Sequence, residues 1–275
     1  MTIINGTKIR KELLEEYQHI IQEEHLDITL AIIQIGSEEA SNIYVQNKMK
    51  YVSQVGIKIK LVQLEETVSE KVVLDIIHQL NEDSNITGII LQKPTPNAID
   101  FDTCSQMISP LKDVDGLTKE NLLAIRNQKE QIIPCTVAGI LKILDYYSIP
   151  LEGKKVTIIG RSNLIGRPLA DVLLNRNATV FLCHSKTKDL KEITLISDVV
   201  ISAAGQANLI TEDMVKENFI GIDVGMNLID GKLIGDFSKE VEAKASYLTP
   251  VPGGVGPMTV AMVIHNLIKL KNGMK

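Results

Sequence analysis

The chain has 275 residues, a net charge of −5, and a composition that is 44% hydrophobic and 23% charged. This length is natural for two α/β domains of roughly 100–150 residues each, and the composition predicts a globular protein. No Lys/Arg-rich block offers a face that could follow phosphates, so nucleic acid is not an expected partner. The longest apolar run, ITLAIIQIG, is shorter than the roughly 18 residues that a membrane span requires.

The first residues and the cysteines bear on the cellular compartment. The segment MTIINGTKIRKELLEEYQ turns charged and helical at once and shows no apolar core of a signal peptide. Cys104, Cys135 and Cys183 lie far apart without a CxxC spacing. Such a set predicts buried thiols in a reducing cytosol rather than a disulfide framework or a zinc site. We therefore expect a cytoplasmic protein without a metal.

Strand and helix patterns alternate through the first half of the chain. Apolar residues at helical spacing predict a helix over 8–24, and the β-rich run DITLAIIQIG follows it. A second helix is expected over about 38–55, and IKIKLVQL then alternates with the period of a strand. The spacing of Thr67 and Glu70 predicts a capping box for the next helix. ITGIILQ follows as a buried strand.

A second series of the same kind starts near Lys154. It contains the strands KVTIIG, ATVFLC, DVVISAA and FIGIDVG, with a helix after Gly166. A helix in PCTVAGILKILDYYSI precedes this series, and another in PMTVAMVIHNLIKLK closes the chain. The alternation predicts an α/β fold with mostly parallel strands covered on both faces. The sequence permits the last helix to pack back toward the first domain.

The segment VTIIGRSNLIGRPLADVLL has the order of strand, turn and helix that a dinucleotide-binding loop requires. Such a turn needs free backbone N–H groups at a helix N-terminus, where a pyrophosphate is favoured. Gly160 leaves the strand, Ser162 stands where a second glycine is usual, and Gly166 allows the helix to pack closely on the strand. The alternative is an ordinary turn between a strand and a helix.

The end of the next strand bears on the choice of nucleotide. NAD-specific folds place an Asp or Glu there, which accepts a hydrogen bond from the ribose 2′-hydroxyl. This chain has His184, Ser185 and Lys186 instead. No carboxylate repels a 2′-phosphate, and Ser185 and Arg161 offer donors to it, so the pattern favours NADP. The alternative is that Ser185 and Lys186 form a solvated loop end.

Three polar side chains in the first half are candidates for proton transfer. Tyr44 and Lys48 are spaced i, i+4 and share one face of a helix. A phenol beside an amine suits proton transfer if burial lowers the pKa of the lysine. Gln92 stands at the carboxyl end of a buried strand, where α/β sheets bind ligands. The alternatives are a surface lysine beside a half-buried tyrosine and a polar residue that ends a strand.

Two loops complete the candidates. KDVDG contains Asp113 and Asp115, which suit a simple turn and are too few for a calcium site. TPVPGGVGPMTV gathers prolines and glycines before a helix. Such a rigid loop, poor in side chains, lets a flat ligand lie against the backbone. A connector between domains does not need this much constraint, so we interpret the loop as functional.

At these residues the chain closely resembles the bifunctional methylenetetrahydrofolate dehydrogenase/methenyltetrahydrofolate cyclohydrolase family, essentially from end to end. TPVPGGVGPMTVAM is the most specific match, and IYVQNKMK, KDVDGL, GRSNLIGRP, CHSKT and IDVGMN support it in the expected order. The resemblance implies an N-terminal three-layer α/β folate-binding catalytic domain and a C-terminal Rossmann-type NADP domain. We expect the boundaries 1–136 plus 258–275 and 137–257. A cleft between the domains and a homodimer through the NADP domain are also implied.

The resemblance further implies a reaction and its residues. Such enzymes oxidise 5,10-methylenetetrahydrofolate with NADP⁺ and hydrolyse the 5,10-methenyl product to 10-formyltetrahydrofolate, a tetrahydrofolate interconversion linked to purine biosynthesis. Lys48 resembles the catalytic lysine and Gln92 the residue that holds it. Tyr44 resembles a partner that faces the pterin, and Asp115 the carboxylate that grips it. The implied folate-site residues are Gly253, Gly254 and Pro257, and the implied NADP contacts are Gly160, Arg161, Ser162, Ser185 and Met226.

The chain departs from the family pattern at three positions. Lys93 and Thr95 stand where leucines are common, which places them at the edge of the pocket, and Lys93 could attract the carboxylates of the folate tail. Val137 replaces a proline and costs the helix start some pre-organisation. Two other functions stay open: another NADP-linked two-domain oxidoreductase, and a non-catalytic sensor of folate or nucleotide. The first alternative gives no reason for the presence of Tyr44, Lys48, Gln92 and the proline–glycine loop together. The second predicts loss of the lysine or the glutamine, and both are present.

Overall fold

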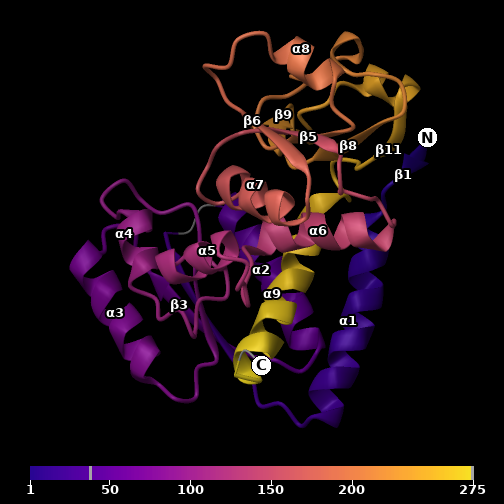
Figure 1. Cartoon of the computed structure of the whole chain (residues 1–275). Helices are drawn as coiled ribbons and strands as arrows, with labels where there is room; N and C mark the ends of the chain where they lie inside the picture. Colours follow the sequence, from indigo (N-terminus) through magenta and orange to yellow (C-terminus); the bar gives the residue numbers. More distant parts are fainter. Residues whose placement is uncertain (37–38, 274–275) are drawn as a thin grey trace. The chain divides into compact units, whose positions relative to one another are not determined.

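The computed structural model describes residues 1–36 and 39–273, and the side chains of residues 39–41, 43 and 44 also lie outside the described part. Contacts within the chain divide it into two compact units, each built on its own parallel sheet (Figure 1). The three-stranded unit comprises Glu12–Cys135 and Val260–Lys275, and the six-stranded unit comprises Met1–Lys11 and Thr136–Thr259. The chain therefore passes between the units three times.

The three-stranded unit has the strand order β3-β2-β4 with both pairings parallel. The central strand is buried along almost its whole length, as expected for a parallel strand covered on both faces. Every residue of the edge strand β3 is exposed or partly exposed. The elements are β2 (Thr29–Ile35), α2 (Glu39–Gln54), β3 (Lys58–Leu64), α3 (Glu70–Glu82), β4 (Gly88–Leu91), α4 (Phe101–Gln106) and α5 (Lys119–Arg126).

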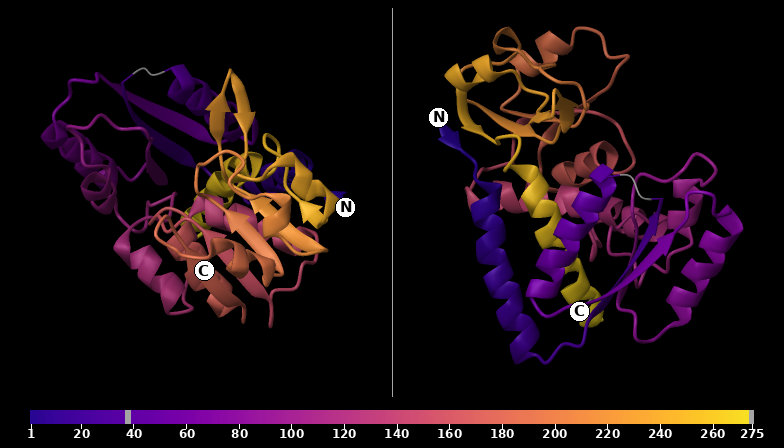
Figure 2. Two further views of the ribbon diagram at one scale, coloured as in Figure 1. Left: turned by 90° about the horizontal axis from the view of Figure 1, so that it is seen from above. Right: turned by 180° about the vertical axis from the view of Figure 1, so that it is seen from behind.

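The six-stranded unit has the order β1-β11-β8-β7-β5-β6, again with parallel pairings. Its strands are β1 (Thr2–Ile3), β5 (Lys155–Ile159), β6 (Thr179–Cys183), β7 (Val199–Ser202), β8 (Phe219–Asp223) and β11 (Ala245–Leu248). Its helical elements are α6 (Cys135–Tyr146), α7 (Gly166–Asn175), α8 (Leu190–Leu195), η1 (Glu212–Met214) and η2 (Lys239–Ala243). A separate antiparallel hairpin, β9 (Asn227–Ile229) and β10 (Lys232–Ile234), extends away from this sheet (Figure 2).

Two long helices, α1 (Gly6–Glu23) and α9 (Val255–Lys271), each supply residues to both units. In the three-stranded unit, the later part of α9 packs closely on the sheet: a Cβ added at Gly88 of β4 would lie 2.7 Å from Leu267. The Tyr17 hydroxyl of α1 is 3.4 Å from His265 Nδ1 of α9. Residues 260–271 therefore belong to the three-stranded unit, and the sequence had permitted this packing of the last helix.

The structure confirms the order of the predicted helices and strands, corrects one detail and adds elements that were not predicted. The expected capping box at Thr67 and Glu70 is wrong, because α3 begins at Glu70 with Ser69 as its N-cap residue. Glu70 therefore occupies the first helical position, and its Oε2 instead accepts a 2.7 Å hydrogen bond from the backbone N–H of Asp100. The pairing of β1 with β11 and the β9–β10 hairpin were not predicted. A two-residue strand has too little pattern to be recognised without its partner.

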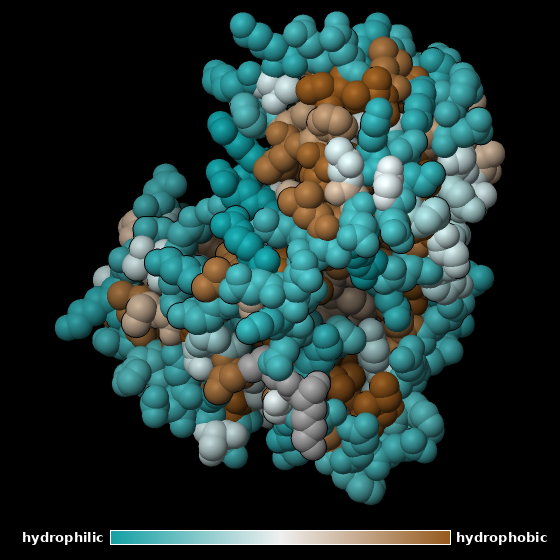
Figure 3. All heavy atoms as spheres, viewed as in Figure 1, coloured by the Kyte–Doolittle hydropathy of each residue, from teal (hydrophilic) through white to brown (hydrophobic). Residues whose placement is uncertain are grey.

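Most exposed side chains on the face shown in Figure 3 are hydrophilic, and hydrophobic ones come to the surface in separate areas. Within the described residues, we find no helix whose length and apolar character would suffice to span a bilayer. The β9–β10 hairpin carries a group of exposed apolar side chains, with Leu228 70% exposed and Ile229 and Leu233 more than 40% exposed.

Candidate active site

Lys48 is a buried lysine on α2, only 4% exposed, and its Nζ donates a 2.9 Å hydrogen bond to Oε1 of Gln92. Gln92 follows β4 directly, and its backbone N–H is bound to the Ile33 carbonyl of the central strand. Its side-chain nitrogen donates to the Lys93 carbonyl at 2.7 Å. Because that bond commits the amide nitrogen, the amide oxygen is the atom that faces Lys48. The strand end thus holds both the position and the orientation of the amide.

Asp115 is a carboxylate whose charge interacts with that of Lys48. Burial raises the pKa of Asp115 above its ordinary value, while the charge of Lys48 acts to lower it. Among the smaller contributions, Asp113 raises this pKa and the Cys135 side chain lowers it. Lys48, Gln92 and Asp115 therefore form one group of polar side chains in the three-stranded unit. Within it, Lys48 is hydrogen-bonded to Gln92 and interacts electrostatically with Asp115.

Asp113 builds the loop that carries Asp115. Its buried carboxylate accepts hydrogen bonds from the Thr118 backbone N–H at 2.8 Å and from Asn121 Nδ2 at 2.9 Å. Gly116 has φ +68°, and a Cβ at this position would lie 2.9 Å from the Pro134 nitrogen. The two aspartates of KDVDG thus differ: Asp113 is committed to the turn, whereas Asp115 belongs to the polar group.

The sequence reasoning missed the role of Asn266 and the place of Cys135. Asn266 is a fully buried residue of α9 whose Nδ2 donates to the Val114 carbonyl at 2.9 Å and to the Ile133 carbonyl at 3.0 Å. The Cys135 thiol donates to the Val114 carbonyl at 3.3 Å, and burial raises its pKa well above the ordinary value. The backbone next to Asp115 is therefore held from two sides. An asparagine within the apolar run VAMVIHNLIKL was the available signal.

Two of the departures from the family pattern lie near this group. A cavity of about 500 Å³ lies in the three-stranded unit beyond the carboxyl ends of β2 and β4. Thr95 lines it, with Ile35, Gly36, Glu66, Pro94, Pro96 and Asn97. The Lys93 ammonium lies 4.0 Å from the centroid of the Phe101 ring, a cation–π contact. In this structure Lys93 is thus engaged with α4.

The glycine turn of the six-stranded unit is as close-packed as a dinucleotide loop requires. Gly160 has φ +120°, and a Cβ there would lie 2.5 Å from the Ala203 carbonyl oxygen. A Cβ at Gly166 would lie 1.8 Å from the Gly160 carbonyl oxygen. Ser162, in place of the usual glycine, uses its Oγ to accept a 3.2 Å hydrogen bond from the Ile165 backbone N–H. The turn therefore brings α7 onto β5 with its N-terminus at the carboxyl edge of the sheet, which fits a pyrophosphate.

The residues expected to contact the nucleotide are exposed around that edge. Arg161 in the turn and Ser185 after β6 are both exposed, as is Met226 after β8, at 63%. The segment after β6 forms a tight turn in which the His184 backbone N–H donates to Thr187 Oγ1 at 2.9 Å. The strand end where an acidic residue would select NAD thus offers a hydroxyl, which fits a 2′-phosphate.

The proline–glycine loop belongs to the same unit and packs on the start of α1. Gly253 has φ +111°, and its carbonyl accepts a hydrogen bond from the Thr7 backbone N–H. A Cβ at Gly6 would lie 1.8 Å from the Gly254 carbonyl oxygen. Pro257, in the first turn of α9, is partly exposed. The loop is therefore constrained by backbone contacts on one side.

Tyr44, the remaining predicted residue, lies on the described backbone of α2 one turn before Lys48, but its side chain is outside the described residues. Among those that are described, no group of three or more His, Cys, Asp or Glu side chains is arranged to hold a metal ion.

The chain matches two family models that together cover most of its length. Residues 4–115 match the catalytic domain of tetrahydrofolate dehydrogenase/cyclohydrolase, and residues 134–274 match the NAD(P)-binding domain of the same family. The chain belongs to the tetrahydrofolate dehydrogenase/cyclohydrolase family.

Relatives and solved structures agree with this assignment over nearly the whole chain. The bifunctional protein FolD of Lactobacillus acidophilus is 45% identical over 94% of this chain and 92% of its own length. A crystal structure of FolD from Campylobacter jejuni is 42% identical and has a TM-score of 0.97, covering 99% of both chains. FolD of Trypanosoma brucei, solved with NADP and an inhibitor, is 31% identical with a TM-score of 0.93, covering 99% of this chain and 98% of its own.

The two family models assign a different function to each unit. The catalytic-domain match lies almost entirely in the three-stranded unit, which carries Lys48, Gln92 and Asp115. The NAD(P)-binding match covers the part of the six-stranded unit that carries the glycine turn. This member of the family thus has an α/β fold with one parallel sheet in each unit.

Proposed function

We propose that Lys48, Gln92, Asp115 and Tyr44 carry the chemistry of this bifunctional enzyme. As a member of the family, the protein oxidises 5,10-methylenetetrahydrofolate to 5,10-methenyltetrahydrofolate with NADP⁺ and hydrolyses the product to 10-formyltetrahydrofolate. The single observation that supports our residue assignment most strongly is the 2.9 Å hydrogen bond between the buried Lys48 Nζ and Gln92 Oε1.

In the hydrolytic step, Lys48 handles the proton of the attacking water. Its nitrogen takes or passes on this proton when water adds to the methenyl carbon. Gln92 holds the nitrogen in place through an amide whose own nitrogen is bound to the Lys93 carbonyl. Tyr44 lies on the same helix one turn before Lys48, and we propose it as the residue that faces the pterin and orients the lysine.

Asp115 binds the substrate. A carboxylate that accepts hydrogen bonds from pterin N–H groups fixes the ring and with it the one-carbon unit. The carboxylate is also close enough to Lys48 for their charges to interact. We also propose Gly253, Gly254 and Pro257 as residues that contact folate, because a backbone poor in side chains lets a flat ring approach it.

NADP⁺, when bound, supplies the hydride acceptor. In our assignment, Gly160 and Ser162 of the glycine turn hold the pyrophosphate, Arg161 and Ser185 hold the 2′-phosphate, and Met226 contacts the nucleotide.

The domain boundaries expected from the sequence, 1–136 plus 258–275 and 137–257, are part of this proposal. The 10-formyl product would feed reactions that consume formyl groups, with purine biosynthesis as the proposed destination.

We further propose a cytoplasmic homodimer formed through the NADP domain. A cytoplasmic location is supported by Cys104, Cys135 and Cys183, which are buried free thiols. The β9–β10 hairpin of the six-stranded unit supports the dimer because it exposes Leu228, Ile229 and Leu233, side chains that a second copy would cover. Sedimentation of Leu228→Asp should give a monomer, whereas a dimer of unchanged stability would remove this interface.

A coupled spectrophotometric assay tests the reaction assignment. Methylenetetrahydrofolate and NADP⁺ are mixed with the enzyme, and absorbance reports first the reduced nucleotide and the methenyl compound and then the decay of the methenyl compound. Both phases should be seen, and NADP⁺ should be used in preference to NAD⁺. A sensor would bind both ligands without turnover, and an oxidoreductase for another substrate would give no reduced nucleotide with methylenetetrahydrofolate.

A further inference from the structure

Asp236 is a carboxylate with no exposed surface that lies at the carboxyl edge of the six-stranded sheet. It accepts five hydrogen bonds, all from uncharged donors. Oδ2 accepts from Ser202 Oγ at 2.8 Å, Ala204 N at 2.8 Å and Gly205 N at 3.2 Å, and Oδ1 accepts from Gln206 N at 2.9 Å and Asn227 Nδ2 at 3.1 Å. The loop 203–206 thus turns three successive backbone N–H groups, those of residues 204–206, toward one buried carboxyl group.

This loop lies directly against the glycine turn. It leaves the carboxyl end of β7, which pairs with β5 so that Ser202 faces Ile159. The Ala203 backbone N–H donates to the Ile159 carbonyl at 2.8 Å, and the Ala203 carbonyl lies where it would meet any side chain at Gly160. Asp236 therefore shapes the backbone that borders the nucleotide-binding edge.

A second buried carboxylate, that of Asp223, connects the end of β8 to the segment that carries Asp236. Asp223, the last residue of β8, accepts from Gly225 N and Asp236 N through Oδ1 and from Phe237 N through Oδ2, at 2.9–3.0 Å. A Cβ at Gly225 would lie 2.1 Å from Asp236 Oδ1, and one at Gly235 would lie 2.0 Å from Asp223 Oδ2. The two glycines leave space for the carboxylates. The hydrogen bonds of Asp223 and Asp236 thus connect the loops that follow β7 and β8.

The strand order indicates which half of the nucleotide lies over the loops after β7 and β8. In a doubly wound sheet the dinucleotide lies across the carboxyl ends of the strands, with the adenosine ribose at the strand after the glycine turn. That strand is β6, and on the other side of β5 the order continues with β7 and β8. With the adenosine half over β6 and the pyrophosphate at the β5 turn, the nicotinamide half falls over the loops after β7 and β8.

We propose that Asp236 is a positioning residue for the nicotinamide half of NADP, acting through the 203–206 loop. The inference rests on the binding of NADP at this sheet edge. By drawing the N–H groups of the loop inward, Asp236 sets the path of the backbone against which the nicotinamide lies. In Asp236→Asn one acceptor oxygen becomes a donor, which leaves at least two of the inward N–H or hydroxyl groups without a partner.

The test compares two ligands on the full-length enzyme: NADP⁺, and adenosine 2′,5′-bisphosphate, which has the adenosine half and the 2′-phosphate but no nicotinamide. For Asp236→Asn we expect the Kd of NADP⁺ to rise at least about tenfold, with the ratio of dehydrogenase to cyclohydrolase kcat/KM falling by a similar factor. The Kd of adenosine 2′,5′-bisphosphate should equal that of the wild type. If both ligands lose affinity equally, Asp236 is merely structural, and if neither does, it has no positioning role.

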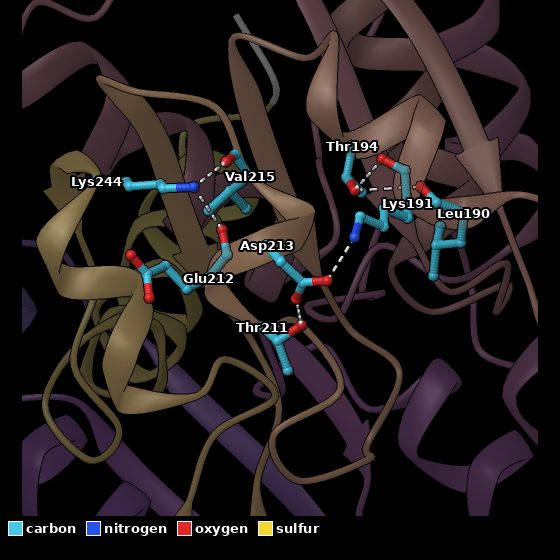
Figure 4. Close-up of polar contacts among 8 residues, drawn as sticks. All are labelled: Leu190, Lys191, Thr194, Thr211, Glu212, Asp213, Val215 and Lys244. Carbon is cyan, nitrogen blue, oxygen red and sulfur yellow. Dashed lines mark hydrogen bonds and ion pairs between the residues drawn. The ribbon is translucent and has the colours of Figure 1, made fainter.

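Two further variants keep the outcome decisive. Asn227→Ala removes one donor to Asp236 Oδ1 and should shift NADP⁺ binding in the same direction by about threefold, so it decides the question if Asp236→Asn does not fold. Asp213→Asn is the matched control, because Asp213 is an exposed aspartate of the same unit, bound to Lys191 and Thr211 (Figure 4). It should leave the binding of both ligands unchanged. A wild-type enzyme that binds neither ligand would overturn the NADP site and this inference together.

Discussion

The Nζ of Lys48 and the Oε1 of Gln92 are joined by a buried 2.9 Å hydrogen bond, although the two residues lie 44 positions apart in the chain. The bond connects the middle of a helix to the end of a strand, and the strand in turn is tied to the centre of the sheet. A side chain as flexible as lysine is thereby held in one place, which a group that handles a proton requires.

Replacing Lys48 by methionine should abolish cyclohydrolase activity and leave NADP⁺ binding intact. Methionine keeps much of the buried apolar stem but removes the nitrogen that handles the proton, so a loss of about 10²–10⁴-fold in kcat is expected. The decay of methenyltetrahydrofolate measures it. Lys50→Met, two residues along α2 and exposed, is the control and should be fully active. A Lys48→Met enzyme that hydrolyses at nearly the parent rate would show our assignment to be wrong.

Asp115→Asn should weaken folate binding and alter its pH dependence. Because burial raises the pKa of Asp115, the carboxylate gains a proton at a higher pH than an ordinary aspartate as the medium is acidified. Wild-type affinity for folate should therefore fall with decreasing pH through that raised pKa, whereas the asparagine variant should lack this phase. We expect its KM for methylenetetrahydrofolate to rise about tenfold or more. Identical pH profiles of KM for the two proteins would contradict a role for the charge.

Arg161→Ala should reduce affinity for NADP⁺ more than for NAD⁺. A guanidinium bound to a phosphate contributes a charge-assisted hydrogen bond, so the ratio of the two affinities should change by roughly tenfold or more. Titration with each nucleotide measures the ratio. Arg126→Ala, an exposed arginine at the end of α5 in the other unit, should not change it. Equal losses for the two nucleotides would remove the argument for a 2′-phosphate contact.

The free energy of unfolding should vary with pH because Asp223 titrates differently in the folded and unfolded states. Burial raises its pKa from 3.8 to about 6, outweighing the backbone N–H groups that it accepts from. The folded state then holds a proton more tightly than the unfolded state, so this group's contribution to the free energy of unfolding is largest below about pH 4. It declines as the pH rises toward 6.

Urea unfolding of the wild type and Asp223→Asn across this range measures that contribution. A rise in pKa from 3.8 to about 6 corresponds to roughly 3 kcal/mol, so the wild type should lose about that much stability relative to the variant between pH 4 and pH 7. A difference between the two proteins that stays constant with pH would show that the carboxylate is not perturbed by burial.

The glycine turn predicts a steric effect that is independent of charge. In Gly166→Ala the new methyl group would lie 1.8 Å from the Gly160 carbonyl oxygen, so α7 must move away from β5. Overpacking of this kind costs typically about 1–3 kcal/mol of stability, and the displaced helix N-terminus should also bind NADP⁺ less well. Gly153→Ala is a comparison with open space around the Cβ, although its φ of +71° is itself strained. Unchanged NADP⁺ affinity in Gly166→Ala would show that the turn tolerates an outward shift.

Local patterns in the sequence were enough to find most helices and strands, because apolar periodicity and glycine sterics act over a few residues. The same local chemistry marked Gly160 and Gly166 as a nucleotide turn and the strand end at Ser185 as one without a carboxylate. Asp113 and Asp115 could not be told apart in this way, since they share one motif and differ only in what surrounds them after folding.

What the sequence by itself determined is therefore the order of elements, the two-part α/β plan and the identity of the chemical groups. Only the tertiary structure decided which groups meet: Gln92 with Lys48, Asn266 with the backbone beside Asp115, and Asp236 with the loop after β7. Such partners are distant in the chain, and buried polar groups must find hydrogen bonds wherever packing brings the backbone. That requirement belongs to the folded interior as a whole, so no short segment encodes it.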